Sequence, residues 1–203
     1  MRGHLAEFGL VVPQGAANAT RLIALVEDPG SGLPAEAIPT LKVLVTALTH
    51  LEEEIGRLDV EIERRAKENE VARRLMTVPG IGPVIATAIA VLAPPPQTFR
   101  RGRDFAAWLG LTPRQHSTGG KQRLGATTKM GERSLRRLLI LGANSVIIKR
   151  HVHAAAKPGT WLGRMLSRKP PLLVRVALAN KMARIAWALM ARGGVYRAPA
   201  VAV

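Results

Sequence analysis

The chain has 203 residues, 47% of them hydrophobic and 3% aromatic, and carries a formal net charge of +16. This length allows one good-sized core with an extension, and the apolar content excludes wholesale disorder. The absence of cysteine excludes a disulfide framework and a thiolate metal site. No uncharged apolar run reaches the ~20 residues that span a bilayer and the start has no secretory signal, so we expect a cytoplasmic protein without membrane contact.

The two signs of charge are separated along the sequence. Residues 1–70 contain 7 Lys or Arg and 12 Asp or Glu, a net of −5. Residues 71–203 contain 23 Lys or Arg but only two acids, Asp104 and Glu132, a net of +21. An ordinary solvated surface mixes both signs, whereas a field this positive accumulates phosphate-bearing partners. The asymmetry therefore favours nucleic acid as the partner.

The first third of the chain predicts a linker followed by a long helix. Residues 1–39 are rich in Pro and Gly around one apolar patch, which predicts a linker with a short helix. From Leu41 to Ile62 apolar residues recur at alternating spacings of three and four, the seam of a coiled coil, and we assign residues 40–76 to this helix. Acidic residues flank the seam and disfavour a parallel homodimer. The alternative is an amphipathic helix lying on its own domain.

A glycine turn with the sequence VPGIGP, residues 78–83, joins two predicted helices. It resembles a helix-hairpin-helix, in which backbone N–H groups approach a DNA phosphate, so Pro79, Gly80 and Gly82 are candidate DNA contacts. A structural corner between two helices would need the same glycines, and both interpretations stay open. Further helices are predicted near residues 104–109, 132–150 and 172–192, and no long strand pattern occurs. The predicted fold is mainly α, a coiled-coil helix followed by a helical domain.

A glycine-rich loop between Trp108 and the helix at 132–150 contains Ser117 among cations. A serine in such a loop is an ordinary turn residue unless its surroundings suit attack on a phosphate. His151 and His153 are the nearest approach to a metal-ligand pair, but no third ligand stands close to them in sequence, so no metal site is predicted. The cations that could hold DNA phosphates are Arg114, Lys121, Arg123, Lys129, Arg133, Arg136 and Arg137.

Three sequence blocks then follow one another in order: VPGIGPVIATAIA, DFAAWLGLTPRQHSTGGKQRLGATTKMGERSLRRLLILGA and ALANKMARIAWALMARGGVYR. Together they resemble the C-terminal half of an insertion-sequence transposase family, the bridge-RNA-guided serine recombinases. Members of that family join an N-terminal RuvC-like acidic nuclease domain through a coiled coil to a C-terminal domain with a nucleophilic serine. The resemblance covers residues 40–197. It implies Ser117 as the nucleophile, with Thr118 as a weaker candidate, in a serine transposase domain at 77–197 followed by a tail at 198–203.

The resemblance implies a DNA transposase, or site-specific recombinase, that contributes a serine nucleophile to DNA strand cleavage and exchange. Because the family's acidic domain is missing, we expect a truncated chain that is not competent alone. Mg²⁺ would come only with that domain, so no cofactor is expected in this chain. The implied partners are DNA, a guide RNA and a homo-oligomer or mixed oligomer through the coiled coil, in the nucleoid. The alternative is a non-catalytic DNA- or RNA-binding module that modulates a full-length transposase.

Overall fold

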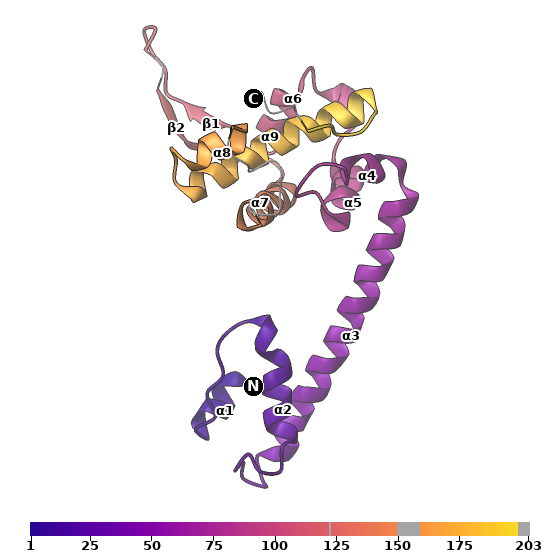
Figure 1. The fold of residues 1–203 in the computed structure, drawn as a ribbon, viewed down its shortest axis with the longest axis vertical. Helices are drawn as coiled ribbons and strands as arrows, with labels where there is room; N and C mark the ends of the chain where they lie inside the picture. The colour runs from indigo at the N-terminus through magenta and orange to yellow at the C-terminus, as the bar shows by residue number, and fades with distance from the viewer. Residues whose placement is uncertain (122, 150–158, 199–203) are drawn as a thin grey trace. The chain divides into compact units, whose positions relative to one another are not determined.

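The computed structural model describes residues 1–121, 123–149 and 159–198. These residues form α-helices and one small two-stranded sheet (Figure 1), which confirms the prediction of a mainly α protein. The chain divides into two compact units, Met1–Val60 and a second that begins at Glu61. The long helix α3 (Ile38–Glu68) crosses that boundary. Among the helices of the described residues, none combines the length and apolar content needed to cross a membrane.

The first unit has a small apolar core of its own. It contains, in chain order, α1 (Arg2–Glu7), the 3-10 helix η1 (Ala16–Asn18), α2 (Ala19–Glu27) and the beginning of α3. Leu5, Val26, Leu41 and Val45 are buried together in it. Residues 1–39, predicted as a linker with a short helix, therefore contribute two α-helices and buried side chains to this core.

The seam of α3 changes character along the helix. Leu41, at its beginning, is buried in the core of the first unit. Leu51, Ile55 and Leu58, further along the same seam, are 57–60% exposed. The predicted three–four spacing thus produces one helix with an exposed apolar stripe, and a coiled-coil partner for that stripe stays a prediction.

The helix predicted over residues 40–76 is interrupted at Asn69. Helix α3 ends at Glu68, and a separate helix α4 (Glu70–Leu75) begins after Asn69. The Asn69 side chain accepts a hydrogen bond from the backbone N–H of Ala72 (2.9 Å). Asn is a preferred N-cap residue because its side-chain oxygen satisfies one of the unpaired N–H groups at a helix start. The chain therefore starts a new helix at this position.

In the second unit the helices pack around α9 (Pro171–Arg192), which contacts α4, α6, α7 and α8 (Figure 1). Helix α9 can occupy this position because buried residues such as Val174, Met182 and Leu189 lie along its whole length. The other elements of this unit are α5 (Pro83–Leu92), η2 (Pro96–Thr98), α6 (Gly102–Trp108), β1 (Pro113–Gln115), β2 (Leu124–Thr127), α7 (Arg133–Ile148) and α8 (Trp161–Leu166).

The turn between α4 and α5 packs directly on α7. Gly80 has a φ of +87°, and a Cβ at this position would lie 2.7 Å from the carbonyl oxygen of Gly142 and 2.8 Å from Val146 Cγ2. Only a residue without a side chain fits there. By contrast, a Cβ at Gly82 would meet no atom within 4 Å. Gly80 therefore has the structural role that the corner interpretation requires, whereas a phosphate contact at this turn stays a prediction.

Candidate nucleic-acid interface at the serine hairpin

The glycine-rich segment, predicted as a loop, forms an antiparallel hairpin that projects from the helices of the second unit (Figure 1). Strand β1 pairs with β2, with Pro113 opposite Thr127 and Gln115 opposite Leu124 and an irregular register between these pairs. The strands have only three and four residues, too few for an alternating pattern to be recognised in the sequence. The Gly-Gly pair between them was the available signal, because it is typical of a hairpin turn.

The end of the hairpin is a tight turn at Gly119 and Gly120. Their φ values are +54° and +78°, and the N–H of Lys121 donates to the carbonyl oxygen of Thr118 (3.0 Å). Positive φ at both central residues is typical of a type I′ turn, whose twist matches that of the flanking strands. Ser117 therefore stands immediately before a defined turn.

The Ser117 hydroxyl has two partners within the hairpin. Its oxygen accepts a hydrogen bond from the backbone N–H of Arg123 (3.1 Å), and its O–H donates to Oε1 of Gln115 (3.3 Å). The side chain is exposed to solvent at the same time. These contacts orient the hydroxyl on the surface, where an extended substrate can reach it. Gln115 escaped the sequence analysis because nothing in the local pattern indicated that its side chain would turn toward Ser117.

His116 immediately precedes Ser117 and faces the other arm of the hairpin, at Arg123 and Gly125. Its backbone N–H donates to the carbonyl oxygen of Arg123 (2.8 Å). A Cβ at Gly125 would lie 2.8 Å from both Cδ2 and Nε2 of the His116 ring. The imidazole therefore needs a glycine at position 125 to lie where it does, a second local relationship that the sequence pattern did not reveal.

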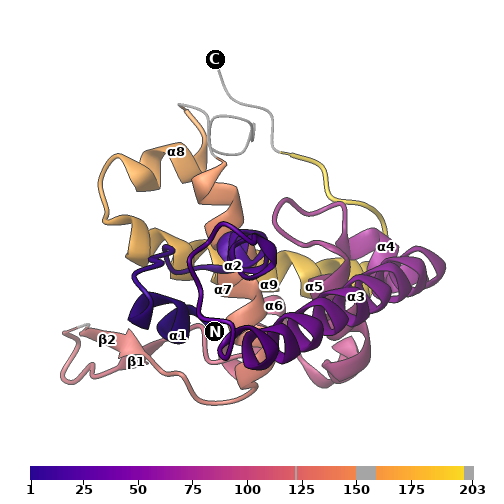
Figure 2. The same cartoon turned by 90° about the horizontal axis from the view of Figure 1, so that it is seen from below.

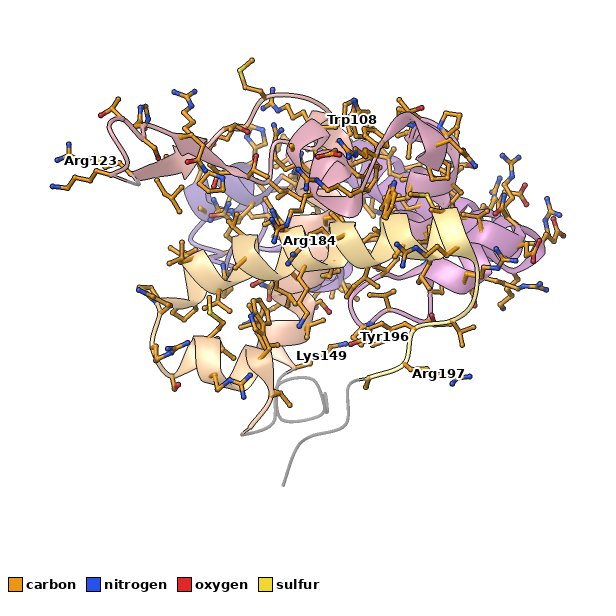
Figure 3. All side chains as sticks on the ribbon, turned by 90° about the horizontal axis from the view of Figure 1, so that it is seen from above. Trp108, Arg123, Lys149, Arg184, Tyr196 and Arg197 are labelled. Atoms are coloured by element: carbon orange, nitrogen blue, oxygen red, sulfur yellow. The ribbon has the colours of Figure 1, made fainter. Side chains whose placement is uncertain are left out.

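Most of the predicted DNA-binding cations are exposed on this hairpin and on the first turns of α7. Arg123 is at the outer end of the hairpin and points away from the helices (Figure 3). In the described part of the chain no carboxylate forms an ion pair with any of these cations. They are therefore available to a polyanion. The exposed members of the set are Arg114, Lys121, Arg123, Lys129, Arg133 and Arg137.

Arg136 differs from the other cations because it is half-buried. Its Nη1 donates to the carbonyl oxygens of Leu109 (3.0 Å) and Met130 (3.4 Å). These bonds connect the C-terminal end of α6 with the loop before α7. Arg136 thus has a structural contact in addition to its predicted role in DNA binding.

The remaining predicted contacts, Pro79, Gly80 and Gly82, are not brought to the hairpin. They belong to the α4–α5 turn, and in Figures 1 and 2 α4 and α5 lie at the end of the helical body away from β1 and β2. No group of three or more His, Cys, Asp or Glu that could hold a metal ion occurs in the residues that the structure describes. His151 and His153 lie outside the described residues.

Comparison with known proteins relates this site to a family. Residues 72–157 match the model of the family described as Transposase IS116/IS110/IS902. The transposase for insertion sequence element IS1328 of Yersinia enterocolitica is 36% identical over 196 residues, 97% of this chain. That for element IS1111A of Coxiella burnetii is 36% identical over 199 residues, and a Pseudomonas aeruginosa protein named "Probable family 20 transposase" is 44% identical over 200. These matches relate the chain to the IS110/IS116 family of transposases.

The chain spans 54–59% of the length of these three relatives. The segment that matches the IS110/IS116 family model contains α5, α6, the hairpin with Ser117, and α7. Helices α8 and α9 follow that segment but lie within the similarity to the three transposases, which covers 97% of this chain. The hairpin and the helices that support it therefore lie in the part of this chain that is similar to these transposases.

Proposed function

We propose that this chain is a transposase polypeptide that binds DNA through the hairpin and α7, and that Ser117 attacks a DNA phosphodiester. The observation that carries the proposal is the Ser117 hydroxyl, exposed on a hairpin whose cations have no ion-pair partner among the described residues. The relationship to a transposase family supports DNA as the substrate. We also propose that the protein acts in the nucleoid, where its DNA substrate lies.

In the proposed step the Ser117 oxygen forms a bond to phosphorus while the bond from phosphorus to one deoxyribose oxygen breaks. The hydroxyl proton must leave to a base, because the free serine hydroxyl is a weak nucleophile. Gln115 orients this proton but does not remove it, since a carboxamide is not a base at neutral pH. Arg114 and Arg123, on the two strands, would stabilise the charge that develops on the phosphate oxygens.

The proposal assigns the base, and any Mg²⁺, to an acidic domain supplied by a longer polypeptide. The described residues offer no carboxylate cluster for a divalent ion, so we derive no step through a metal in this chain. We further propose that the exposed stripe of α3 joins this chain to a second copy or to a full-length transposase. A guide RNA would be a second nucleic-acid partner.

A covalent-trapping experiment tests Ser117. The chain is incubated with a duplex that carries a phosphorothiolate at the cleaved position, alone and mixed with a full-length relative whose own serine is changed to alanine. We expect a protein–DNA adduct containing the 21.8 kDa chain. Ser117→Ala should abolish the adduct and preserve DNA binding, while Thr118→Ala should retain both. An adduct that survives Ser117→Ala would contradict the assignment.

A non-catalytic module is the second candidate, and one observation favours it. Neither hydrogen-bond partner of the Ser117 hydroxyl, the Arg123 N–H or the Gln115 carboxamide, can accept its proton as a base. If no adduct forms in either mixture but the chain binds DNA and inhibits the full-length relative, the module is the correct function. Inhibition should then be unaffected by Ser117→Ala.

A further inference from the structure

A second group of cations lies where α8 packs on α9. In Figures 2 and 3 the hairpin and α8 lie on different sides of α9, and Figure 3 shows Arg184 near the middle of α9 and Arg123 at the outer end of the hairpin. The hairpin cations and this group are therefore separate surfaces of the second unit. None of the residues proposed above for DNA binding belongs to the α8–α9 group.

Lys181 is held against the first residue of α8. Its Nζ lies 4.4 Å from the centroid of the Trp161 ring. An ammonium over an indole face is attracted by the negative face of the ring, which fixes a side chain that is otherwise flexible. Trp161 and Lys181 are both half-buried, so part of this pair stays accessible to solvent.

Two further cations approach Lys181. Burial lowers the pKa of Lys181, and the positive charges of Arg184 and Arg164 lower it further. Arg164 donates through Nη1 to the carbonyl oxygen of Gly159 (3.0 Å), and the Nε of Arg184 is buried without a hydrogen-bond partner. The contact with Trp161 thus holds Lys181 between α8 and α9, where the positive charges of Arg164 and Arg184 oppose its protonation.

The two helices that carry these cations provide no negative side chain to balance them. The sequence contains no Asp or Glu after Glu132, so neither α8 nor α9 carries a carboxylate. An anion placed among the three cations would remove their mutual repulsion and accept hydrogen bonds from two guanidinium groups. Phosphate matches this arrangement, since guanidinium groups bind it in a fixed planar geometry and an ammonium adds a point charge.

We propose that Lys181, Arg184 and Arg164 form a phosphate-binding site for a nucleic-acid backbone, distinct from the Ser117 hairpin. The proposal rests on the proposed nucleic-acid function but is independent of the chemistry at Ser117. Two separate cationic surfaces on one helical body let the protein hold two strands, or two segments of one strand, at once.

Pyridoxal 5′-phosphate is a suitable probe of this site, because it brings a phosphate and an aldehyde that condenses with a neutral amine and releases water. After borohydride reduction, peptide mapping should find Lys181 labelled faster than the exposed Lys42 of the first unit. Pyridoxal, which lacks the phosphate, should show a much smaller preference for Lys181. Arg164→Gln should reduce labelling by the phosphate form more strongly than labelling by pyridoxal, because pyridoxal responds only to the higher pKa of Lys181 that follows from losing the Arg164 charge. Equal labelling of Lys181 by both aldehydes would overturn the proposal.

Nucleic-acid protection identifies the ligand. Labelling is repeated at low salt with duplex DNA in one experiment and single-stranded RNA in the other, and a bound nucleic acid should slow labelling of Lys181. The nucleic acid that slows it more is the one whose phosphates occupy the site. If neither protects, the site binds a free phosphate only and the backbone proposal is wrong. Because labelling of Lys181 needs neither DNA cleavage nor a protein–DNA adduct at Ser117, a failure here can be distinguished from a failure of the trapping experiment.

Nucleic-acid binding by variants with and without the charges of this site tests the proposal independently of labelling. The pair Lys181→Gln with Arg164→Gln should weaken binding of the protected nucleic acid by about tenfold and reduce the slope of log affinity against log salt by about 1–2. Lys181→Arg keeps the charge and should restore most of the affinity, whereas Lys42→Gln, an exposed position in the first unit, should change neither quantity. Thermal melting monitors folding, and an unchanged slope in a folded double variant would reject the site.

Discussion

Gly80 and Gly142 face each other through their backbones, with no room for a side chain on either residue. One belongs to the turn before α5, and the other lies in the middle of α7. Both fall within the segment that matches the family model. This contact sets the approach of the α4–α5 turn to the helix that follows the serine hairpin.

Gly142→Ala should therefore destabilise the second unit. The added methyl group would overlap the carbonyl oxygen of Gly80 and crowd Ile85 Cδ1, so the turn must move away from α7. Overpacking of this kind costs about 1–3 kcal/mol in the free energy of unfolding. Chemical denaturation followed by circular dichroism measures the change.

Gly56→Ala is the matched control, because Gly56 is also helical but a Cβ there meets no atom within 4 Å. This variant should be more stable by up to about 1 kcal/mol, since alanine has the higher helix propensity. Equal effects of the two substitutions would mean that the Gly80–Gly142 contact does not constrain the fold.

The helices could be predicted from the sequence because their signals are local. The helix expected at 172–192 is α9, Pro171–Arg192, and it ends where Gly193 adopts a φ of +75°. The spacing of three and four also located α3. It could not reveal that Leu41 is buried while Leu51 is exposed, because that difference depends on which other helices pack nearby.

The candidate site was predicted less completely than the helices. Ser117 was found through a family resemblance, and its exposed position in the hairpin is compatible with that role. Its contacts with Gln115 and the Arg123 N–H depend on strand pairing across the turn, which no local pattern encodes. For the same reason Arg136 looked equivalent to Arg137 in the sequence, although only Arg136 bonds to the carbonyl oxygen of Leu109.

Substitutions of Arg136 and of Arg137 should affect the stability of the fold and the binding of DNA differently. Arg136→Gln removes hydrogen bonds to two carbonyl oxygens and should lower the free energy of unfolding by about 1–3 kcal/mol, as well as weakening DNA binding. Arg137→Gln changes an exposed side chain and should weaken DNA binding while leaving the melting temperature nearly unchanged. Fluorescence anisotropy with a labelled duplex and thermal melting measure the two properties. A melting temperature that is unchanged in Arg136→Gln would contradict the structural role.

The stability of α3 should depend on pH through Glu61. Hydrogen bonds from Arg64 and Arg65 lower the pKa of the Glu61 carboxyl from 4.5 to about 2. A carboxyl whose pKa is lower in the folded state stabilises that state above its unfolded pKa and loses this contribution on protonation. Helix content should therefore be maintained at pH 4.5 and fall as the pH approaches 2.

Carbon NMR of the Glu61 carboxyl in the whole chain follows this titration directly, with Glu61→Gln used to assign the signal. Because these ion pairs are exposed, 1 M salt should move the pKa back toward 4.5. A Glu61 titration near pH 4.5 at low salt would show that the arginine contacts are absent in solution.

The exposed stripe of α3 should mediate the proposed self-association. Ile55→Gln with Leu58→Gln changes side chains that are 57% and 60% exposed, so the first unit should stay folded while the molar mass from light scattering falls toward that of a monomer. Leu41→Gln, a buried position on the same seam, should instead unfold the first unit. A wild-type chain that is monomeric at high concentration would contradict the partner role of this stripe.

The orientation of that oligomer can be read from engineered disulfides, because the chain contains no cysteine of its own. In an antiparallel pair centred between Ile55 and Leu58, Leu51 of one copy would lie opposite Ile62 of the other. Leu51→Cys mixed with Ile62→Cys should then form a mixed disulfide under mild oxidation, and each variant alone should form little. Efficient homodimeric disulfides from either variant alone would indicate parallel helices, the arrangement in which Glu52, Glu54 and Asp59 of one copy approach the same acidic residues of the other.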